Sequence, residues 1–180
     1  MHSHFDQLVP LNVSIITVSD TRDESTDKSG AFLAEAAQTA GHHVVHRQIV
    51  VDDLYQIRAV VSDRIAAADT QVVLLTGGTG FRLRDVTPEA VTPLLDREIP
   101  GFGEYFRSVS AAEIGTSTMQ SRVLGGVANG TLVFCLPGST NACRTAWNGI
   151  LKEQLDATHK PCNFVEILDV NPAAAEAQPS

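Results

Sequence analysis

The residues that could do chemistry gather around a glycine-rich segment near the middle of the chain. Gly77, Gly78 and Gly80 follow a short apolar run, and Asp85 comes shortly after them. Glycine adopts positive φ easily and lets a ligand approach the bare backbone, so the amides of such a loop can bind a phosphate. The same residues would also make a tight turn without a ligand. Because three glycines in four residues are more than a turn needs, we expect an anion-binding site here.

The chain does not contain the common sequence motifs for phosphate binding or for a catalytic serine. Leu83 stands where the dinucleotide-binding pattern G-x-G-x-x-G needs its third glycine, and G-x-x-x-x-G-K-[ST] fits nowhere, including the register from Gly138. The nucleophile pattern G-x-S-x-G is also absent, and Ser139 has no histidine or carboxylate at a recognisable spacing. A covalent hydrolase is therefore not expected.

Acidic residues follow three of the predicted strands. Asp20 comes after the first, Asp52 and Asp53 after the second, and Asp85 after the third. Because the carboxyl ends of parallel strands meet at one edge of a sheet, these carboxylates are expected to converge. Together they would suit a hard cation such as Mg²⁺, whereas each alone could simply serve the helix that follows it. For Asp85 the residues alone favour the two roles equally.

Other charged or metal-binding side chains carry less weight. Arg82 and Arg84 could contact phosphate, although solvated loop charges are the simpler interpretation. His42, His43 and His46 look like a metal cluster, but positions 42 and 46 of a strand lie ~13 Å apart. A zinc site is therefore not expected.

Alternating strand and helix patterns predict the elements that position these residues. Segments 11–19, 42–51 and 72–75 are predicted to be strands, and the last is a short apolar run typical of a strand buried on both faces. Between them, 29–40 and 54–68 show apolar residues at helical spacing. This alternation predicts an α/β fold built from right-handed βαβ units, with a parallel sheet covered on both sides.

After the glycine loop the pattern continues with helix signals. Thr87, Pro88 and Glu89 predict a helix start, with Thr87 as N-cap and the N-terminus adding to the anion site. A short helix is expected at 102–110, and 115–120 is either a loop or a helix start.

The C-terminal half contains a strong hairpin signal. Asn129-Gly130 separates apolar segments at 121–127 and 131–136, which predicts a two-residue turn between antiparallel strands. The second strand leads into a tight turn at 137–141 and a helix at 142–155. Two turns leaving two buried strands suggest the two walls of one crevice.

Length and composition bound the class of protein. The 180 residues fit one domain, expected at 11–168, with a loose arm at 1–10, a last strand near 164–168 and a disordered tail at 169–180. A net charge of -8 argues against general nucleic-acid binding. Neither a membrane-spanning stretch nor a signal-peptide pattern is found, so we expect a cytoplasmic protein. The three cysteines form no CxxC pair, and Cys135 reads as a buried, reduced thiol.

Several segments together resemble the MoaB/Mog family of molybdenum-cofactor biosynthesis proteins. The resemblance spans roughly 12–168, and the segment 138–147, GSTNACRTAW, is most similar to the MoaB branch. The segments that carry it are TGGTG at 76–80, RDVTPEA at 84–90, DREIPGFGE at 96–104, GTST at 115–118 and LPGS at 136–139.

The resemblance implies a three-layer α/β/α fold with a mostly parallel sheet, assembled as a homo-oligomer, either trimer or hexamer. It also implies binding of molybdopterin and, in active members, its adenylylation by MgATP with release of pyrophosphate. Some MoaB-branch members lack the central Arg-Asp pair, but this chain keeps Arg84-Asp85. A non-catalytic molybdopterin-binding or carrier protein is the alternative, and a generic nucleotide-binding domain is a third.

The family's functional residues are carried over by motif. Its two functional aspartates correspond to Asp85 and to either Asp52 or Asp53, with Asp85 and Asp53 as the candidate Mg²⁺ ligands. The substrate-binding loops correspond to Ser19, Asp20, Thr76, Gly77, Gly78, Thr79, Gly80, Pro137, Gly138 and Ser139.

Overall fold

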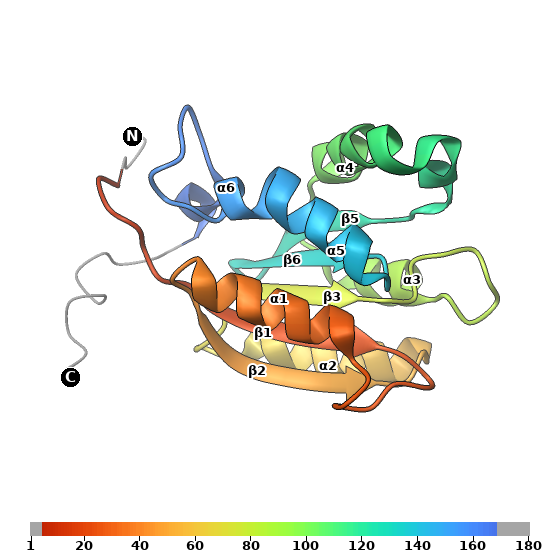
Figure 1. Ribbon diagram of the computed structural model, residues 1–180. Coiled ribbons are helices and arrows are strands. Elements are labelled where there is room, and N and C mark those ends of the chain that lie inside the picture. Colours follow the sequence, from red (N-terminus) through yellow and green to blue (C-terminus); the bar gives the residue numbers. More distant parts are fainter. Residues whose placement is uncertain (1–4, 169–180) are drawn as a thin grey trace.

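A six-stranded sheet in the order β2-β1-β3-β6-β5-β4 forms the centre of the molecule (Figure 1). The computed structural model describes residues 5–168. Strands β1, β2, β3 and β6 are parallel, whereas β5 is antiparallel to β6 and β4 is antiparallel to β5. The predicted mostly parallel sheet is confirmed. The strands are β1 (Asn12–Val18), β2 (His43–Val50), β3 (Val72–Thr76), β4 (Arg97–Glu98), β5 (Leu124–Ala128) and β6 (Thr131–Leu136).

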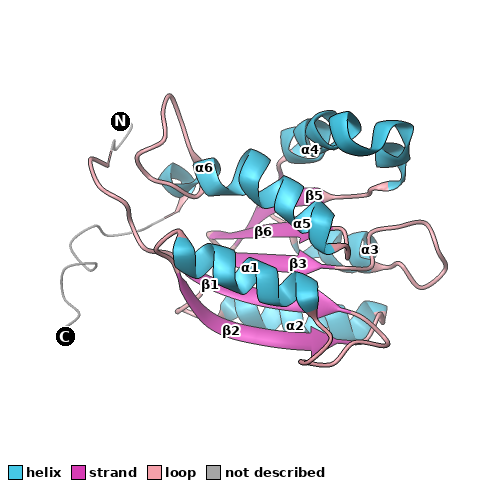
Figure 2. Cartoon of the chain, viewed as in Figure 1, coloured by secondary structure: helices cyan, strands magenta, loops and turns pink. Residues whose placement is uncertain are grey.

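Helices cover both faces of the sheet, which confirms the three-layer α/β/α arrangement (Figure 2). One apolar cluster joins the sheet to α1, α4 and α5, and the other joins it to α2 and α3. Near the C-terminus, a π-helical turn at Trp147–Leu151 connects α5 to α6. The helices are α1 (Lys28–Thr39), α2 (Leu54–Ala66), α3 (Thr87–Val91), α4 (Pro100–Ile114), α5 (Thr140–Ala146) and α6 (Lys152–Gln154).

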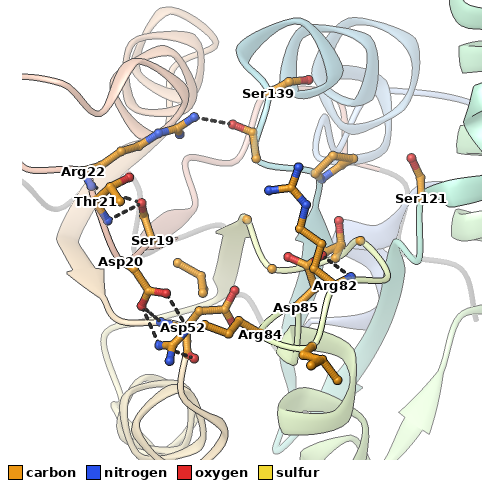
Figure 3. Close-up of a pocket in the computed structure, with 18 of the residues that line it drawn as sticks. Ser19, Asp20, Thr21, Arg22, Asp52, Arg82, Arg84, Asp85, Ser121 and Ser139 are labelled. Atoms are coloured by element: carbon orange, nitrogen blue, oxygen red, sulfur yellow. Dashed lines mark hydrogen bonds and ion pairs between the residues drawn. The ribbon is translucent and has the colours of Figure 1, made fainter.

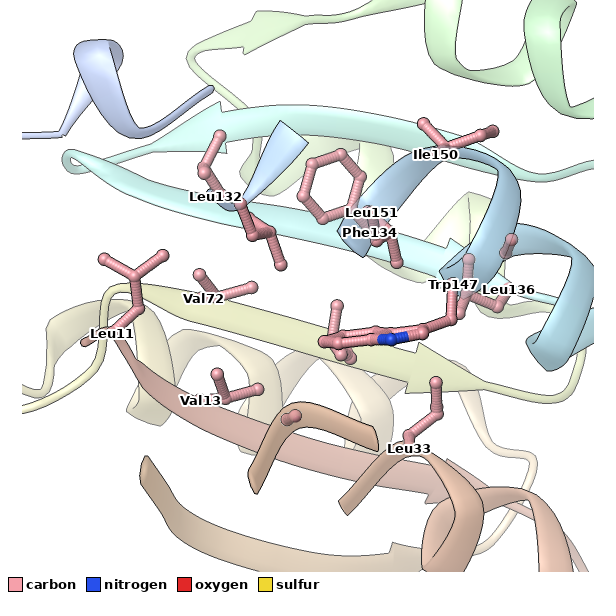
Figure 4. Packing of buried hydrophobic residues seen from close by; sticks show 14 of the residues in the cluster. Leu11, Val13, Leu33, Val72, Leu132, Phe134, Leu136, Trp147, Ile150 and Leu151 are labelled. Carbon is pink, nitrogen blue, oxygen red and sulfur yellow. The ribbon is translucent and has the colours of Figure 1, made fainter. Parts of the chain in front are cut away.

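Alternating side chains of the central strands feed the two clusters. In β3, Val72 and Leu74 belong to the first cluster, and Val73 and Leu75 belong to the second. Figure 4 shows the first cluster, where Trp147 lies over the strands among aliphatic side chains. Burial of one such side chain contributes about 1.5–3 kcal/mol, so the sheet is a firm frame for the loops at its edge.

The strand register brings the ends of the central strands together. Thr76 of β3 pairs with Thr17 of β1 on one side and with Leu136 of β6 on the other. The loops that follow these strands therefore leave the same edge of the sheet, as parallel strands require.

The predicted hairpin turn is present; its second strand has the predicted bounds, and its first is shorter than expected. Asn129 has φ 49° and Gly130 has φ 75°, the two positive values that a type I′ turn needs. Strand β5 begins at Leu124 rather than at position 121.

Several predicted boundaries in the C-terminal half were wrong. The helix expected at 102–110 is the longer α4, because Pro100 suits its first turn and Gly115, at φ 57°, ends it. Residues 115–120 form a 3-10 helix. The helix expected at 142–155 begins at Thr140 and is interrupted by the π-helical turn.

The last predicted strand was also wrong. Residues Phe164–Ile167 form a 3-10 helix, whose first turn is capped by Asn163 through a bond from the Glu166 amide. The ring of Phe164 packs against Phe134, with centroids 5.6 Å apart. A short, mostly apolar segment fits either a strand or a helical turn. Here the packing of Phe164 on the sheet favours the helical turn.

The N-terminal segment is only partly the loose arm that was expected. Val9 is buried and Phe5 packs against the first cluster, so 5–10 belong to the folded body. Residues 1–4 and the tail predicted at 169–180 lie outside the described residues. Within 5–168, no helix is both long enough and apolar enough to span a bilayer.

Candidate functional site

A cleft of about 800 Å³ opens at the carboxyl edge of the sheet (Figure 3). It is formed by the loops after β1, β2, β3 and β6, together with the end of the 3-10 helix that follows α4. Its lining residues are Val18, Ser19, Asp20, Thr21, Arg22, Asp52, Gly77, Gly78, Thr79, Gly80, Arg82, Leu83, Arg84, Asp85, Gln120, Ser121, Pro137, Gly138 and Ser139.

The two glycine turns lie side by side, as predicted. The amide of Gly77 donates to the Leu136 carbonyl at 3.0 Å, and a Cβ on Gly138 would lie 3.3 Å from the Gly77 Cα. Thr76 is fully buried and does not line the cleft. Its hydroxyl donates to the Pro137 carbonyl at 2.9 Å, so Thr76 holds the turns together from beneath.

Packing accounts for all three glycines of the first turn. Gly77 and Gly78 have φ of 113° and 64°, and a Cβ on Gly77 would lie 2.2 Å from a backbone oxygen of β1. A Cβ on Gly80 would lie 2.5 Å from the Asp85 carboxylate. The number of glycines therefore does not by itself indicate a ligand, and the case for a site rests on the cleft.

Thr87 does not cap the helix that follows the glycine loop. The residue before α3 is Val86, which makes no side-chain cap. The Thr87 hydroxyl instead donates to the Gly77 carbonyl at 2.9 Å and is buried. Because α3 has only five residues, its dipole adds little to the site. The helix N-terminus therefore contributes less than expected, and an anion in the cleft would meet loop amides and arginine side chains.

Three of the four predicted carboxylates line the cleft: Asp20, Asp52 and Asp85. Asp53 does not. Its carboxylate accepts bonds from the amides of Tyr55 at 3.1 Å and Gln56 at 3.0 Å, which makes it the N-cap of α2. Of the neighbouring pair, Asp52 is therefore the residue that a bound substrate could meet.

Asp20 and Arg84 form a two-point ion pair across the cleft floor. Arg84 donates from Nε at 2.6 Å and from Nη2 at 2.8 Å to the two carboxylate oxygens of Asp20. It also donates to the Asp52 carbonyl at 3.2 Å, and the Asp52 amide donates to Asp20. The bond from Arg84 holds the pKa of Asp20 below its usual value. Although its side chain is exposed, Arg84 is thus committed to Asp20 and to the Asp52 carbonyl; it ties three strand ends together.

Among the described residues, the carboxylates of Asp52 and Asp85, unlike that of Asp20, make no ion pair with an arginine. Burial raises the pKa of Asp52, and the charges of Asp85 and Asp20 raise it further, against a bond from the Val86 amide at 3.3 Å. Asp85 accepts the Arg82 amide at 2.8 Å, which closes the loop that carries it. These two side chains therefore concentrate negative charge that a cation would relieve.

Within 5–168, no three His, Cys, Asp or Glu side chains are close enough together to hold a metal ion by themselves. The expected site of converging carboxylates is thus reduced to two, because Asp20 is paired and Asp53 faces α2. Two carboxylates still fit Mg²⁺, which commonly binds one or two together with substrate phosphates and water.

Sequence reasoning missed several lining residues. Arg22 donates from Nη1 to the Ser29 hydroxyl at 2.6 Å and from Nη2 to the Gly138 carbonyl at 3.0 Å. Its position just beyond the end of β1 was the available signal. Ser121 was placed in a strand, and nothing in the local pattern marks it or Gln120 as lining residues.

Comparison with known sequences identifies the family. The sequence model of a family described as "Probable molybdopterin binding domain" matches residues 14–157. "Molybdenum cofactor biosynthesis protein B" of Escherichia coli is 57% identical over 158 residues, covering 88% of this chain and 93% of the relative. The protein of that name from Bacillus subtilis is 44% identical over 142 residues, covering 78% and 84%.

Solved structures show the same relationship. A crystal structure of "Molybdenum cofactor biosynthesis protein B" has a TM-score of 0.80 and 47% identity, covering 82% of this chain and 92% of the other. The "tungsten cofactor synthesizing protein MoaB" from Pyrococcus furiosus has a TM-score of 0.72 and 38% identity, covering 80% and 92%. The chain therefore belongs to the MoaB/Mog family of molybdenum-cofactor biosynthesis proteins.

Proposed function

We propose that this protein acts in molybdenum-cofactor biosynthesis by binding molybdopterin and adenylylating it with MgATP. The observation that carries the proposal is that two incompletely paired carboxylates, Asp52 and Asp85, share one cleft with two adjacent backbone turns. Family membership supports molybdopterin as the ligand.

The reaction needs no nucleophile from the protein. An oxygen of the terminal phosphate of molybdopterin attacks the α-phosphorus of ATP, the bond from that phosphorus to the bridging oxygen breaks, and pyrophosphate leaves. Catalysis then consists of holding two phosphates in line and neutralising the negative charge that spreads over them. Amides of Gly78, Thr79 and Gly80 in the first turn, and of Gly138 and Ser139 in the second, would orient the phosphates.

We assign the Mg²⁺-binding role to Asp52 and Asp85 and not to Asp53, which caps α2. When bound, the ion supplies positive charge to the triphosphate and to the leaving pyrophosphate. Without it, carboxylates facing a bare triphosphate would repel the substrate. The bond from the Arg82 amide to Asp85 keeps that carboxylate at a fixed place on the loop.

The test is release of pyrophosphate from MgATP in the presence of molybdopterin. We expect Asp85→Asn and Asp85→Ala to lower kcat by at least about 100-fold while changing the molybdopterin Kd by less than about threefold. Asn keeps an acceptor for the Arg82 amide, so this variant separates charge from loop structure. If Asp85→Asn turned over like the wild type, the role assigned to Asp85 would be withdrawn.

The carrier alternative makes the opposite prediction for the wild type. A protein that only binds or carries molybdopterin would bind the pterin tightly but release no pyrophosphate at any Mg²⁺ concentration. A generic nucleotide-binding domain would bind molybdopterin no better than an unrelated pterin. One titration and one turnover assay on the wild-type protein therefore separate the three functions.

A further inference from the structure

We propose that Arg22 binds the phosphate group of the pterin substrate, beside the Pro137–Ser139 turn. This inference rests on the proposed function, because it names the side chain that would recognise one end of that substrate. It assigns MgATP to the other, acidic side of the cleft.

Arg22 is held firmly at the wall of the cleft. Its guanidinium donates to the Ser29 hydroxyl at 2.6 Å and to the Gly138 carbonyl at 3.0 Å, and its side chain is about one-third exposed. These bonds use two of the five N–H donors of a guanidinium, and the residue lines the cleft. Figure 3 shows Arg22 reaching toward the turn that contains Ser139. An anion there would meet a charge already in position, so little rotamer entropy would be lost on binding.

The two groups that accept hydrogen bonds from Arg22, a hydroxyl and a carbonyl, carry no charge. Its positive charge is balanced only in part, by one carboxylate. Asp27 Oδ1 lies 4.0 Å from Arg22 Nη1, a long ion pair without a hydrogen bond. The fully buried carboxylate of Asp27 is committed elsewhere: it accepts from Arg47, from the Thr17 hydroxyl and from the Gly30 amide, each at 2.9 Å. Two guanidinium groups thus share one carboxylate, and this group of side chains carries net positive charge.

The opposite side of the cleft has the opposite character. Arg84 is neutralised by two bonds to Asp20, and Asp52 and Asp85 add two negative charges there, of which Arg82, which also lines the cleft, offsets one. Figure 3 shows Asp20, Asp52 and Arg84 gathered away from Arg22. A phosphate monoester that brings no cation needs positive charge from the protein, which Arg22 supplies. A triphosphate that arrives with Mg²⁺ suits the carboxylates instead.

The test measures binding of three probes to four proteins by calorimetry, and the KM for MgATP of each protein in the pyrophosphate-release assay. The probes are molybdopterin, dephosphorylated molybdopterin and inorganic phosphate. The proteins are the wild type, Arg22→Met, Arg22→Lys and the control Arg144→Met, which removes an exposed arginine that stacks on Phe32 outside the cleft. Melting temperatures check that each variant folds, and Arg22→Lys keeps the charge if Arg22→Met is unstable.

We expect Arg22→Met to weaken molybdopterin binding about 10- to 100-fold and to abolish phosphate binding. Affinity for the dephosphorylated pterin and the KM for MgATP should change less than about threefold. Arg22→Lys should recover part of the loss, because an ammonium keeps the charge but not the planar geometry. Arg144→Met should match the wild type.

The inference and the proposed function can fail separately. If Arg22→Met weakened binding of both pterins equally, or raised the KM for MgATP more than the molybdopterin Kd, the inference would be overturned. Pyrophosphate release by the wild type would still support the proposed function. If the wild type released no pyrophosphate, but Arg22→Met still lost affinity for molybdopterin and not for the dephosphorylated pterin, the proposed enzymatic activity would be overturned. The phosphate-binding role of Arg22 would stand. A wild type that binds none of the probes would overturn both.

Discussion

Neighbouring residues of one type can have different roles in this cleft, and Asp52 and Asp53 are the clearest case. Both follow β2, and no sequence pattern distinguishes them. They lie in the short loop between Val50 and Leu54, and Asp53 is the residue directly before α2. The backbone at Asp53 directs its carboxylate to the amides of α2, which leaves Asp52 for the ligand.

This division predicts different outcomes for two matched substitutions. Asp52→Asn should reduce pyrophosphate release by about 100-fold or more, because it removes a charge that would hold Mg²⁺. Asp53→Asn should keep turnover within about twofold and leave the melting temperature nearly unchanged, because Asn caps helices as well as Asp does. Equal losses in the two variants would show that the assignment of Asp52 is mistaken.

A buried histidine predicts how stability depends on pH. Burial lowers the pKa of His42 to about 4, with Asp156 opposing only in part, and its Nδ1 accepts the Leu11 amide at 3.2 Å. An unfolded histidine titrates near 6.5, so the unfolded state binds more protons between pH 6.5 and 4. The contribution of His42 to stability should therefore be lost as pH falls through that range.

His42→Asn keeps an acceptor for the Leu11 amide but does not titrate. Between pH 7 and pH 4, the free energy of unfolding should fall by about 2–3 kcal/mol more in the wild type than in this variant. Urea unfolding at both pH values measures the difference, and the carboxylates common to both proteins cancel. The same fall in both proteins would contradict the prediction.

At the scale of elements, burial pattern and turn chemistry decide how well the sequence predicts structure. Strand β3 is buried at every position, and the Asn129-Gly130 turn needs two positive φ angles, so both could be read locally. Segment 164–167 could not, because its 3-10 form depends on the Asn163 cap and on the Phe134 ring. The π-helical turn likewise has no local signal.

The loop from Gly80 to Asp85 depends on an arginine in the connection before β5. Arg122 donates from Nε to the Gly80 carbonyl at 2.8 Å and from Nη2 to the Asp85 carbonyl at 2.6 Å. Its guanidinium also pairs with Glu89 and lies 5.1 Å from the centre of the Phe81 ring. One side chain thus fixes both ends of the loop that carries Asp85.

We therefore expect Arg122 to act as a positioning residue. Arg122→Met should lower kcat about 10- to 100-fold with a smaller change in KM, and amide exchange across 80–85 should become faster. Arg122→Lys should restore little, because one ammonium cannot bridge two carbonyls in a fixed geometry. Glu89→Gln is the control, since it leaves both carbonyl bonds in place. Faster exchange with unchanged kcat would show that the loop position does not matter for turnover.

At the scale of the whole molecule, strand order places the cleft. In the sheet, β2 lies beside β1 on one side and β3 lies beside β1 on the other. The chain reaches β2 through α1 and then crosses through α2 to β3. The loops that leave β1 and β3 therefore part to opposite faces, and this topological switch opens a crevice at the carboxyl edge. The site owes its location to this arrangement rather than to any single motif.

The family resemblance also predicts the state of assembly. We expect a trimer or a hexamer, so light scattering coupled to gel filtration should give three or six times the mass of one chain. The mass should stay constant on dilution to about 1 μM if the interfaces are of the large, stable kind. A monomer at that concentration would contradict the prediction.

The sequence by itself determined the α/β class, the mostly parallel sheet, the hairpin and the family, because these follow from local periodicity, turn chemistry and motifs. It also determined that the two glycine turns would meet, since parallel strands end at a common edge. Only the tertiary structure decided which aspartate faces the cleft, that Arg84 pairs with Asp20, and that Arg22 and Arg47 share one carboxylate. Those outcomes depend on contacts between residues far apart in the chain, which local patterns do not encode.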